Sequence, residues 1–277
     1  MRGPLLFAID IDGTLLNSGR TLDERNWTAI QQAMQSGHFV SLATGRMPAP
    51  ALVWARYLQL NAPVVTLNGA DVVESSTGKS LSCSRIGEEP LLRLVEWVEE
   101  QRLHCRLMGH RYTVCRKDQL DYVQRVWGVQ FRNPEVLLAY NLRDYLAQPA
   151  EPVLKVAVGC QDSERQAQVY AELRSWNAFE IARTEQCELE LTARGTTKLS
   201  GVIRVIEQLN IPLANVIAFG NGENDVDLLR HAGKGYAVAN AEPVVLEQIS
   251  LRTASNDECG VAQVMERIIA EADLRLA

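Results

Sequence analysis

Short apolar runs alternate with stretches of helical periodicity through the first eighty residues of the chain. Three of these runs predict buried strands, at residues 5–9, 39–42 and 64–67. The stretches between them predict helices, at residues 21–36 and 48–58. Thr21 and Glu24 have the spacing of a capping box and predict Thr21 as the N-cap of the first helix. Strands and helices in this order are typical of a parallel sheet covered by helices.

The pattern changes after residue 70. Residues 71–83 resemble a hairpin, and a separate α+β unit follows it. Helices of this unit are predicted at residues 90–101, 119–127 and 163–176, and strands at residues 105–108, 112–115, 153–158, 179–182 and 188–191. The α/β order then returns, with helices at residues 198–209, 224–231 and 260–270 and strands at residues 216–219 and 236–238. The sequence therefore predicts an α/β core formed by residues 1–83 and 191–277, with a second domain inserted at residues 84–190.

The composition is that of a globular protein: 277 residues, 47% hydrophobic and 22% charged. A formal net charge of −6 provides no basic footprint for nucleic acid or an anionic membrane, so an anionic ligand needs a local site. The six cysteines form no Cys-x-x-Cys pair, and no apolar stretch approaches the roughly 20 residues of a membrane span. We therefore expect a cytoplasmic protein with neither nucleic-acid nor membrane partners.

Two carboxylates, Asp10 and Asp12, follow the first predicted strand, and Gly13 allows a tight turn there. Such a pair can bind a hard cation or divide the work of nucleophile and general acid/base. The same Asp-x-Asp spacing recurs at residues 225–227 inside a predicted helix, so the pair alone also fits a solvated strand end.

Small and polar residues also follow the other two early strands: Thr44, Gly45 and Arg46 after the second, and Asn68 with Gly69 after the third. Ligands in open α/β sheets bind beyond the carboxyl ends of the strands, and a hydroxyl with backbone N–H groups suits a phosphate. Taken singly, Thr44 also fits a helix cap and Asn68 a turn.

Residues 7–16, Phe-Ala-Ile-Asp-Ile-Asp-Gly-Thr-Leu-Leu, resemble the first motif of the haloacid dehalogenase-like (HAD) phosphatases. Within that superfamily the chain resembles the Cof-type hydrolases, whose α/β cap is inserted between the second and third motifs. The resemblance implies a Rossmann-like parallel-sheet core with an inserted α+β cap. It also implies that Asp10 attacks a phosphoryl group to form an aspartyl-phosphate, and that Asp12 protonates the leaving oxygen and later activates water.

The next two family motifs follow in order. Residues 43–46, Ala-Thr-Gly-Arg, resemble the second motif and imply that Thr44, Gly45 and Arg46 contact the substrate. Residues 189–198 resemble the passage into the third motif and make Lys198 the lysine that holds the phosphate and balances the carboxylates. The family usually has glycine after that lysine, whereas this chain has Leu199. In isolation Lys198 also fits an exposed lysine at a helix start.

Residues 220–225, Gly-Asn-Gly-Glu-Asn-Asp, resemble the fourth motif, Gly-Asp-x-x-Asn-Asp, with Asn221 in place of the first acid. The resemblance implies magnesium as the cofactor. Its ligands would be Asp10, the backbone carbonyl of Asp12, Asn221 through its amide oxygen, and Asp225. An amide carries no negative charge, so weaker magnesium binding is expected. Asn224 and Asn68 are placed among the substrate contacts.

We therefore expect a magnesium-dependent phosphatase that hydrolyses small phosphomonoesters such as sugar phosphates. A phosphomutase or phosphotransferase with the same intermediate is an alternative, as is a non-catalytic sensor of a phosphate ligand whose metal site is weakened at Asn221. A small phosphorylated metabolite is the expected partner, and a monomer or small homo-oligomer the expected assembly. His104, Arg106, His110 and Arg111 lie on or near one cap hairpin and are either substrate contacts or a solvated face.

Overall fold

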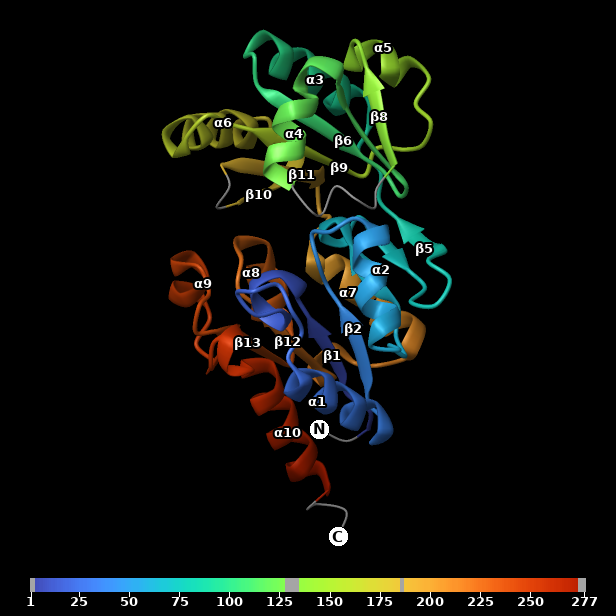
Figure 1. Cartoon of the computed structure of the whole chain (residues 1–277), viewed down its shortest axis with the longest axis vertical. Coiled ribbons are helices and arrows are strands. Elements are labelled where there is room, and N and C mark those ends of the chain that lie inside the picture. Colours follow the sequence, from blue (N-terminus) through green and yellow to red (C-terminus); the bar gives the residue numbers. More distant parts are fainter. Residues whose placement is uncertain (1–2, 128–134, 185–186, 274–277) are drawn as a thin grey trace.

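The computed structural model describes residues 3–127, 135–184 and 187–273. Figure 1 shows two bodies stacked along the long axis of the molecule, each built around its own sheet. The ten helices of the described residues are α1 (Glu24–Gln35), α2 (Pro48–Tyr57), α3 (Glu88–Glu100), α4 (Leu120–Trp127), α5 (Leu142–Ala147), α6 (Ser163–Ser175), α7 (Lys198–Leu209), α8 (Val226–His231), α9 (Pro243–Gln248) and α10 (Gly260–Asp273). No helix in these ranges combines the length and apolar character needed to cross a membrane.

The lower sheet has five parallel strands in the order β14-β13-β12-β1-β2. Its strands are β1 (Leu6–Ile9), β2 (Phe39–Leu42), β12 (Val216–Gly220), β13 (Lys234–Val238) and β14 (Arg252–Thr253). In β1, Phe7 and Ile9 pack into the core formed with α1, α2 and α10, and Leu6 and Ala8 pack into the core formed with α7, α8 and α9. Successive strand side chains point to opposite faces, so this central strand is apolar at every position.

A second, three-stranded sheet joins the lower body. It contains β3 (Val64–Thr66), β4 (Asp71–Val73) and β5 (Ser80–Cys83), which pair antiparallel. The sequence predicts residues 64–67 as a third strand of the parallel sheet, but the backbone pairing of β3 with that sheet is a single parallel bridge, between Ala43 and Val65. Its remaining pairing is with β4, because the chain reverses directly after Gly69 (φ +92°).

The upper sheet has six strands in the order β10-β11-β9-β6-β7-β8. They are β6 (His104–Met108), β7 (Tyr112–Arg116), β8 (Glu135–Ala139), β9 (Lys155–Gly159), β10 (Phe179–Arg183) and β11 (Glu188–Ala193). One face packs on α3, α5 and α6. The other face carries Met108 and Ala157, which join Met47, Leu67 and Ala70 of the lower body in a small apolar cluster. The upper sheet is therefore docked on the loops that follow β2 and β3.

The α/β class, the Rossmann-like parallel sheet and the inserted α+β unit are confirmed. Details of the prediction differ. The first helix is capped by Asp23, whose carboxylate accepts from the Arg25 N–H at 2.8 Å, whereas Thr21 donates its N–H to Asn17. The sequence reading omits β8, α5, α9 and β14, which are two to six residues long. Strand β11 continues through the expected domain boundary at residue 190, because it pairs with β9 as far as Thr192 and with β10 as far as Ala193.

Candidate active site

The two carboxylates of the first motif lie at the carboxyl end of β1. Asp10 is almost fully buried, with 6% of its surface exposed, whereas the side chain of Asp12 is 43% exposed. The chain turns between them and α1 through Gly13, which has a φ of +74°. A Cβ at Gly13 would lie 2.6 Å from Asn221 Nδ2, so both the backbone conformation and the neighbouring side chain require glycine.

Lys198, at the start of α7, joins two acids that are distant in sequence. Its Nζ lies 2.7 Å from Asp10 Oδ1 and 2.7 Å from Asp225 Oδ1, and its side chain is 1% exposed. Asp225 Oδ2 accepts from the backbone N–H groups of Asn221 and Gly222, each at 3.0 Å. Both oxygens of Asp225 thus hold the lysine and the fourth-motif loop in place, and Lys198 is not a surface lysine.

Burial and charge set the protonation of this cluster. Burial raises the pKa of Asp10 from 3.8 to about 7; Lys198 opposes this rise, and Asp225 adds to it. Burial would lower the pKa of Lys198, but the two carboxylates outweigh that effect and raise it. Lys198 therefore stays charged and holds Asp10 in one orientation.

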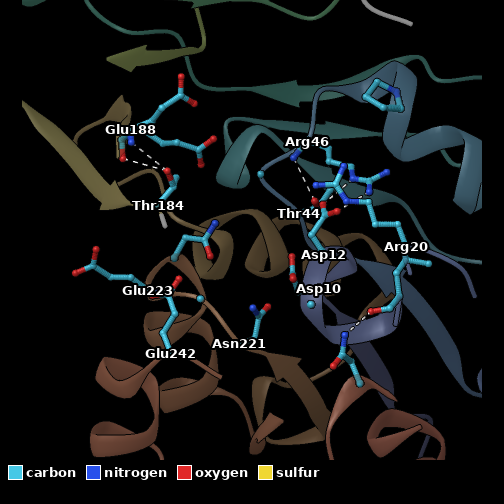
Figure 2. A pocket seen from close by; sticks show the side chains of 18 of the residues that line it. Asp10, Asp12, Arg20, Thr44, Arg46, Thr184, Glu188, Asn221, Glu223 and Glu242 are labelled. Atoms are coloured by element: carbon cyan, nitrogen blue, oxygen red, sulfur yellow. Dashed lines mark hydrogen bonds and ion pairs between the residues drawn. The ribbon is translucent and has the colours of Figure 1, made fainter. Parts of the chain in front are cut away.

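Thr44 and Arg46 follow β2 and approach the first motif. Arg46 makes a two-pronged ion pair with Asp12, with Nε 2.7 Å from Oδ2 and the second nitrogen 2.6 Å from Oδ1. The Arg46 N–H also donates to Thr44 Oγ1 at 3.1 Å. Figure 2 shows Arg46 reaching over Asp12 toward the floor of the pocket. The arginine thus contacts the exposed carboxylate of the motif directly.

A chain of polar contacts continues into the upper sheet. Lys155 of β9 lies 2.5 Å from Glu190 Oε1 and donates to the Gly45 carbonyl at 2.6 Å. Asn68 donates to Glu190 Oε2 at 2.7 Å, and Asn224 donates to Asn68 Oδ1 at 3.0 Å. Sequence reasoning assigned no role to Lys155 or Glu190. The lone lysine in the apolar run 153–158 is the signal that could have found the first of them.

A cavity of about 380 Å³ lies between the two sheets, with Asp10 and Asp12 on its lower side and Glu188 and Thr184 on its upper side. Its charged lining residues are Asp10, Asp12, Arg20, Arg46, Lys155, Arg183, Glu188, Glu190, Glu223 and Glu242. Burial raises the pKa of Glu188, although Arg106, 2.6 Å away, offsets part of the effect. The cavity thus combines cations with an excess of carboxylates.

The sequence-predicted substrate residues divide between this cavity and a neighbouring groove. Thr44, Gly45, Arg46 and Asn224 line the cavity. Asn68 and Lys198 line the groove beside it, to which Asn224 also contributes.

The hairpin residues do not line the cavity. Arg106 pairs with Glu188, His110 with Asp71 and Arg111 with Glu135, while His104 stacks on Tyr122.

The distances from Asn221 to the neighbouring oxygens show whether these residues fit magnesium. The tip of its amide lies 3.2 Å from Asp10 Oδ2 and 2.8 Å from the Asp12 carbonyl oxygen. Adjacent oxygens on an octahedral magnesium ion lie about 2.9 Å apart, since each metal–oxygen distance is about 2.0–2.1 Å. With its amide oxygen at this tip, Asn221 therefore fits the ion together with Asp10 and Asp12. In the described part of the chain, no three His, Cys, Asp or Glu side chains form a metal cluster.

Comparisons with known proteins identify the family of the chain. A family model described as haloacid dehalogenase-like hydrolase matches residues 7–265. The chain is 28% identical to a 5-amino-6-(5-phospho-D-ribitylamino)uracil phosphatase of Bacillus subtilis, YcsE, covering 94% of each protein. It is 23% identical to the pyridoxal phosphate phosphatase YbhA of Escherichia coli, covering 93% of this chain and 96% of that protein. A solved haloacid dehalogenase-like hydrolase from B. subtilis shares the fold, with a TM-score of 0.84, 24% identity, and coverage of 94% and 98%.

Proposed function

The chain belongs to the haloacid dehalogenase-like hydrolases and is a phosphatase of that family, and we propose that it hydrolyses small phosphomonoesters with magnesium through an aspartyl-phosphate on Asp10. The observation that carries this proposal is the Asp10 carboxylate, which lines the cavity and is fixed by Lys198 at 2.7 Å. A nucleophile held in one orientation lowers the entropic cost of attack on phosphorus.

The phosphoryl group is held by the loop after β2. Thr44 presents a hydroxyl and Arg46 a guanidinium at the cavity wall, beside the carboxylate that attacks. Lys198 acts from behind Asp10, where its charge offsets the two carboxylates that it contacts. Asn224 lines the cavity close to Gly45 of this loop and is oriented by Asn68. These groups position the substrate and offset the negative charge of the phosphoryl group and the carboxylates. Positioning and charge stabilisation are most of what phosphoryl transfer requires.

Asp12 moves the protons. It donates to the leaving oxygen when Asp10 attacks, and it takes a proton from the water that releases phosphate from Asp10. Arg46 occupies both oxygens of the Asp12 carboxylate, so the substrate phosphate must draw Arg46 away before Asp12 can reach the leaving oxygen. Asp10, the Asp12 carbonyl and Asn221 would hold magnesium, which would supply positive charge to offset that of the phosphoryl group. We assign Asp225 to positioning Lys198 instead of binding the metal, because both of its oxygens are engaged.

We propose that residues 84–193 act as the cap that selects the leaving group. The cap contributes Glu188, Thr184 and Lys155 to the lining of the cavity, where they suit hydroxyl groups of a small polyol or sugar. YcsE acts on a phosphorylated ribityl compound, which carries such hydroxyls. A sugar phosphate or a similar metabolite phosphate is therefore the proposed substrate class.

Phosphate release from a panel of metabolite phosphates, with and without magnesium, tests the proposal. We expect release that depends on magnesium and is abolished in Asp10→Asn, with an unchanged circular dichroism spectrum. Substantial release by Asp10→Asn would refute the nucleophile assignment. No release by folded wild-type protein from any substrate would favour the non-catalytic sensor.

A further inference from the structure

Asn221 stands where the family motif has an acid, and its side chain faces three oxygens. The amide tip lies 3.2 Å from Asp10 Oδ2, 2.8 Å from the Asp12 carbonyl and 2.9 Å from Thr14 Oγ1. We propose that the Asn221 amide takes the place of the metal when none is bound, by donating hydrogen bonds to the oxygens that hold the ion, and that metal binding requires the amide to turn over. This inference rests on the metal site proposed above.

The two orientations of the amide differ by a half-turn about the Cβ–Cγ bond. With nitrogen at the tip, its two hydrogens serve the ionised Asp10 carboxylate at Oδ2 and the Asp12 carbonyl, and both of these oxygens accept. With oxygen at the tip and Asp10 ionised, three oxygens face one another at hydrogen-bond distance, and no proton lies between Asn221 and either Asp10 or Asp12. That second arrangement is favourable only with a cation among them.

Thr14 supports both orientations. Its hydroxyl is fully buried and lies 2.9 Å from the amide tip. A hydroxyl can donate to the amide oxygen and can equally accept from the amide nitrogen, because its proton rotates. The neighbouring residue therefore imposes no preference, and the choice is left to the metal.

The surroundings allow the side chain to turn while the backbone stays fixed. The Asn221 N–H donates to Asp225 Oδ2 at 3.0 Å, and the Asn221 carbonyl accepts from the Glu242 N–H at 2.8 Å. Gly13 packs against the amide: a Cβ there would lie 2.6 Å from Asn221 Nδ2 and 3.1 Å from its Cγ. Glycine at this position thus leaves room for the amide, and the loop is held without it.

An aspartate at this position would behave differently. It has no proton to donate at neutral pH, and its charge would lie about 3 Å from a buried carboxylate that already faces Asp225 across Lys198. Without metal the aspartate form is therefore strained by like charges, and magnesium relieves that strain. The asparagine form is satisfied without metal and gives up hydrogen bonds to a charged group when the ion enters. Asparagine thus exchanges metal affinity for stability of the metal-free enzyme.

Thermal melting in EDTA and in saturating magnesium, for wild type and Asn221→Asp, tests the inference. We expect Asn221→Asp to melt several degrees below wild type in EDTA and to close or reverse that gap in magnesium. Calorimetry should show at least tenfold tighter magnesium binding by Asn221→Asp. Asn240→Asp is the matched control, because Asn240 donates to the Gly13 carbonyl at 2.8 Å in the adjacent loop. Its change in melting temperature should be the same in both buffers.

Direct observation of the side chain provides a second test. In spectra of ¹⁵N-labelled protein, the Asn221 amide pair is identified by its loss in Asn221→Asp, and it should shift on addition of magnesium as its hydrogen bonds to Asp10 and Asp12 are lost. An unshifted pair at saturating magnesium, or equal melting of the two proteins in EDTA, would overturn the inference. Neither the melting temperatures nor the amide spectra require turnover of a substrate. A failure of the proposed phosphatase activity is therefore distinguishable from a failure of the proposed amide rotation.

Discussion

Removal of Lys155 should destabilise the protein more than removal of the whole ion pair to which it belongs. Lys155 is 2% exposed and Glu190 15% exposed at the side chain, and Lys155 Nζ contacts both Glu190 and the Gly45 carbonyl. Lys155→Met leaves the Glu190 carboxylate buried with the Asn68 amide as its remaining partner among the contacts described above. Breaking one side of a buried pair costs about 3–5 kcal/mol, because the other charge stays desolvated.

The double variant Lys155→Met/Glu190→Gln removes the stranded charge. Replacing both partners of a buried ion pair by uncharged residues often changes the stability little. The double variant should therefore lose about 1–2 kcal/mol of unfolding free energy and be more stable than Lys155→Met. The coupling energy between the two sites should then be at least about 2 kcal/mol. At about 2 °C per kcal/mol for a chain of this size, Lys155→Met should melt about 6–10 °C below wild type.

Melting temperatures of wild type, both single variants and the double variant measure this cycle. Burial would raise the pKa of Glu190, but Lys155 and Asn68 outweigh it and hold that pKa below its ordinary 4.5. The stabilisation is therefore present above pH 4.5 and is lost as the pH falls below it, so the gap between wild type and Lys155→Met should narrow in acid. Additive single effects, or a Lys155→Met protein that melts with wild type at pH 7, would refute the reasoning.

One further prediction concerns an ion pair between the two bodies, and another concerns a close backbone approach within the lower body. Arg183 of the upper sheet pairs with Glu223 at 2.7 Å, but its side chain is 45% exposed, so Arg183→Ala should change the melting temperature little. The substitution should raise KM several-fold in steady-state assays, because it loosens the contact between the cap and the core. An unchanged KM would contradict this. Gly69 has a φ of +92° and its Cβ would lie 1.9 Å from the Thr197 carbonyl oxygen, so Gly69→Ala should cost more than about 2 kcal/mol in urea unfolding. Gly195, with a φ of +76° and open space around it, is the control: Gly195→Ala should cost about 1 kcal/mol, and equal losses would count against the steric argument.

Local patterns predicted most of the fold. The runs at residues 39–42 and 198–209 coincide with β2 and α7, because a buried parallel strand is apolar throughout and an amphipathic helix repeats its apolar positions. The N-cap was placed two residues early, since both Thr21 and Asp23 suit that position and only the observed bond from Arg25 to Asp23 distinguishes them. The omitted elements α9 and β14 have six and two residues, which leaves too few positions for a periodic signal.

The order of the motifs along the sequence predicted Asp10, Asp12, Lys198 and Asp225 as site residues. Their chemistry needs particular residue types at the ends of particular strands, and such signals are local in sequence. The contacts that complete the site are different: Lys155 meets Glu190 across 35 residues and Asn68 meets Glu190 across 122. Nothing in the spacing of such residues identifies them as partners.

The sequence by itself determined the α/β class, the presence of an inserted α+β unit and the acids at the end of the first strand, because each follows from patterns of neighbouring residues. Only the tertiary structure decided that Arg46 covers Asp12, that Asp225 serves Lys198, and that the Asn221 amide faces the oxygens of Asp10 and Asp12. These are matters of direction and distance between side chains on separate loops. Those loops come together only when the sheet brings the carboxyl ends of β1, β2 and β12 to one edge.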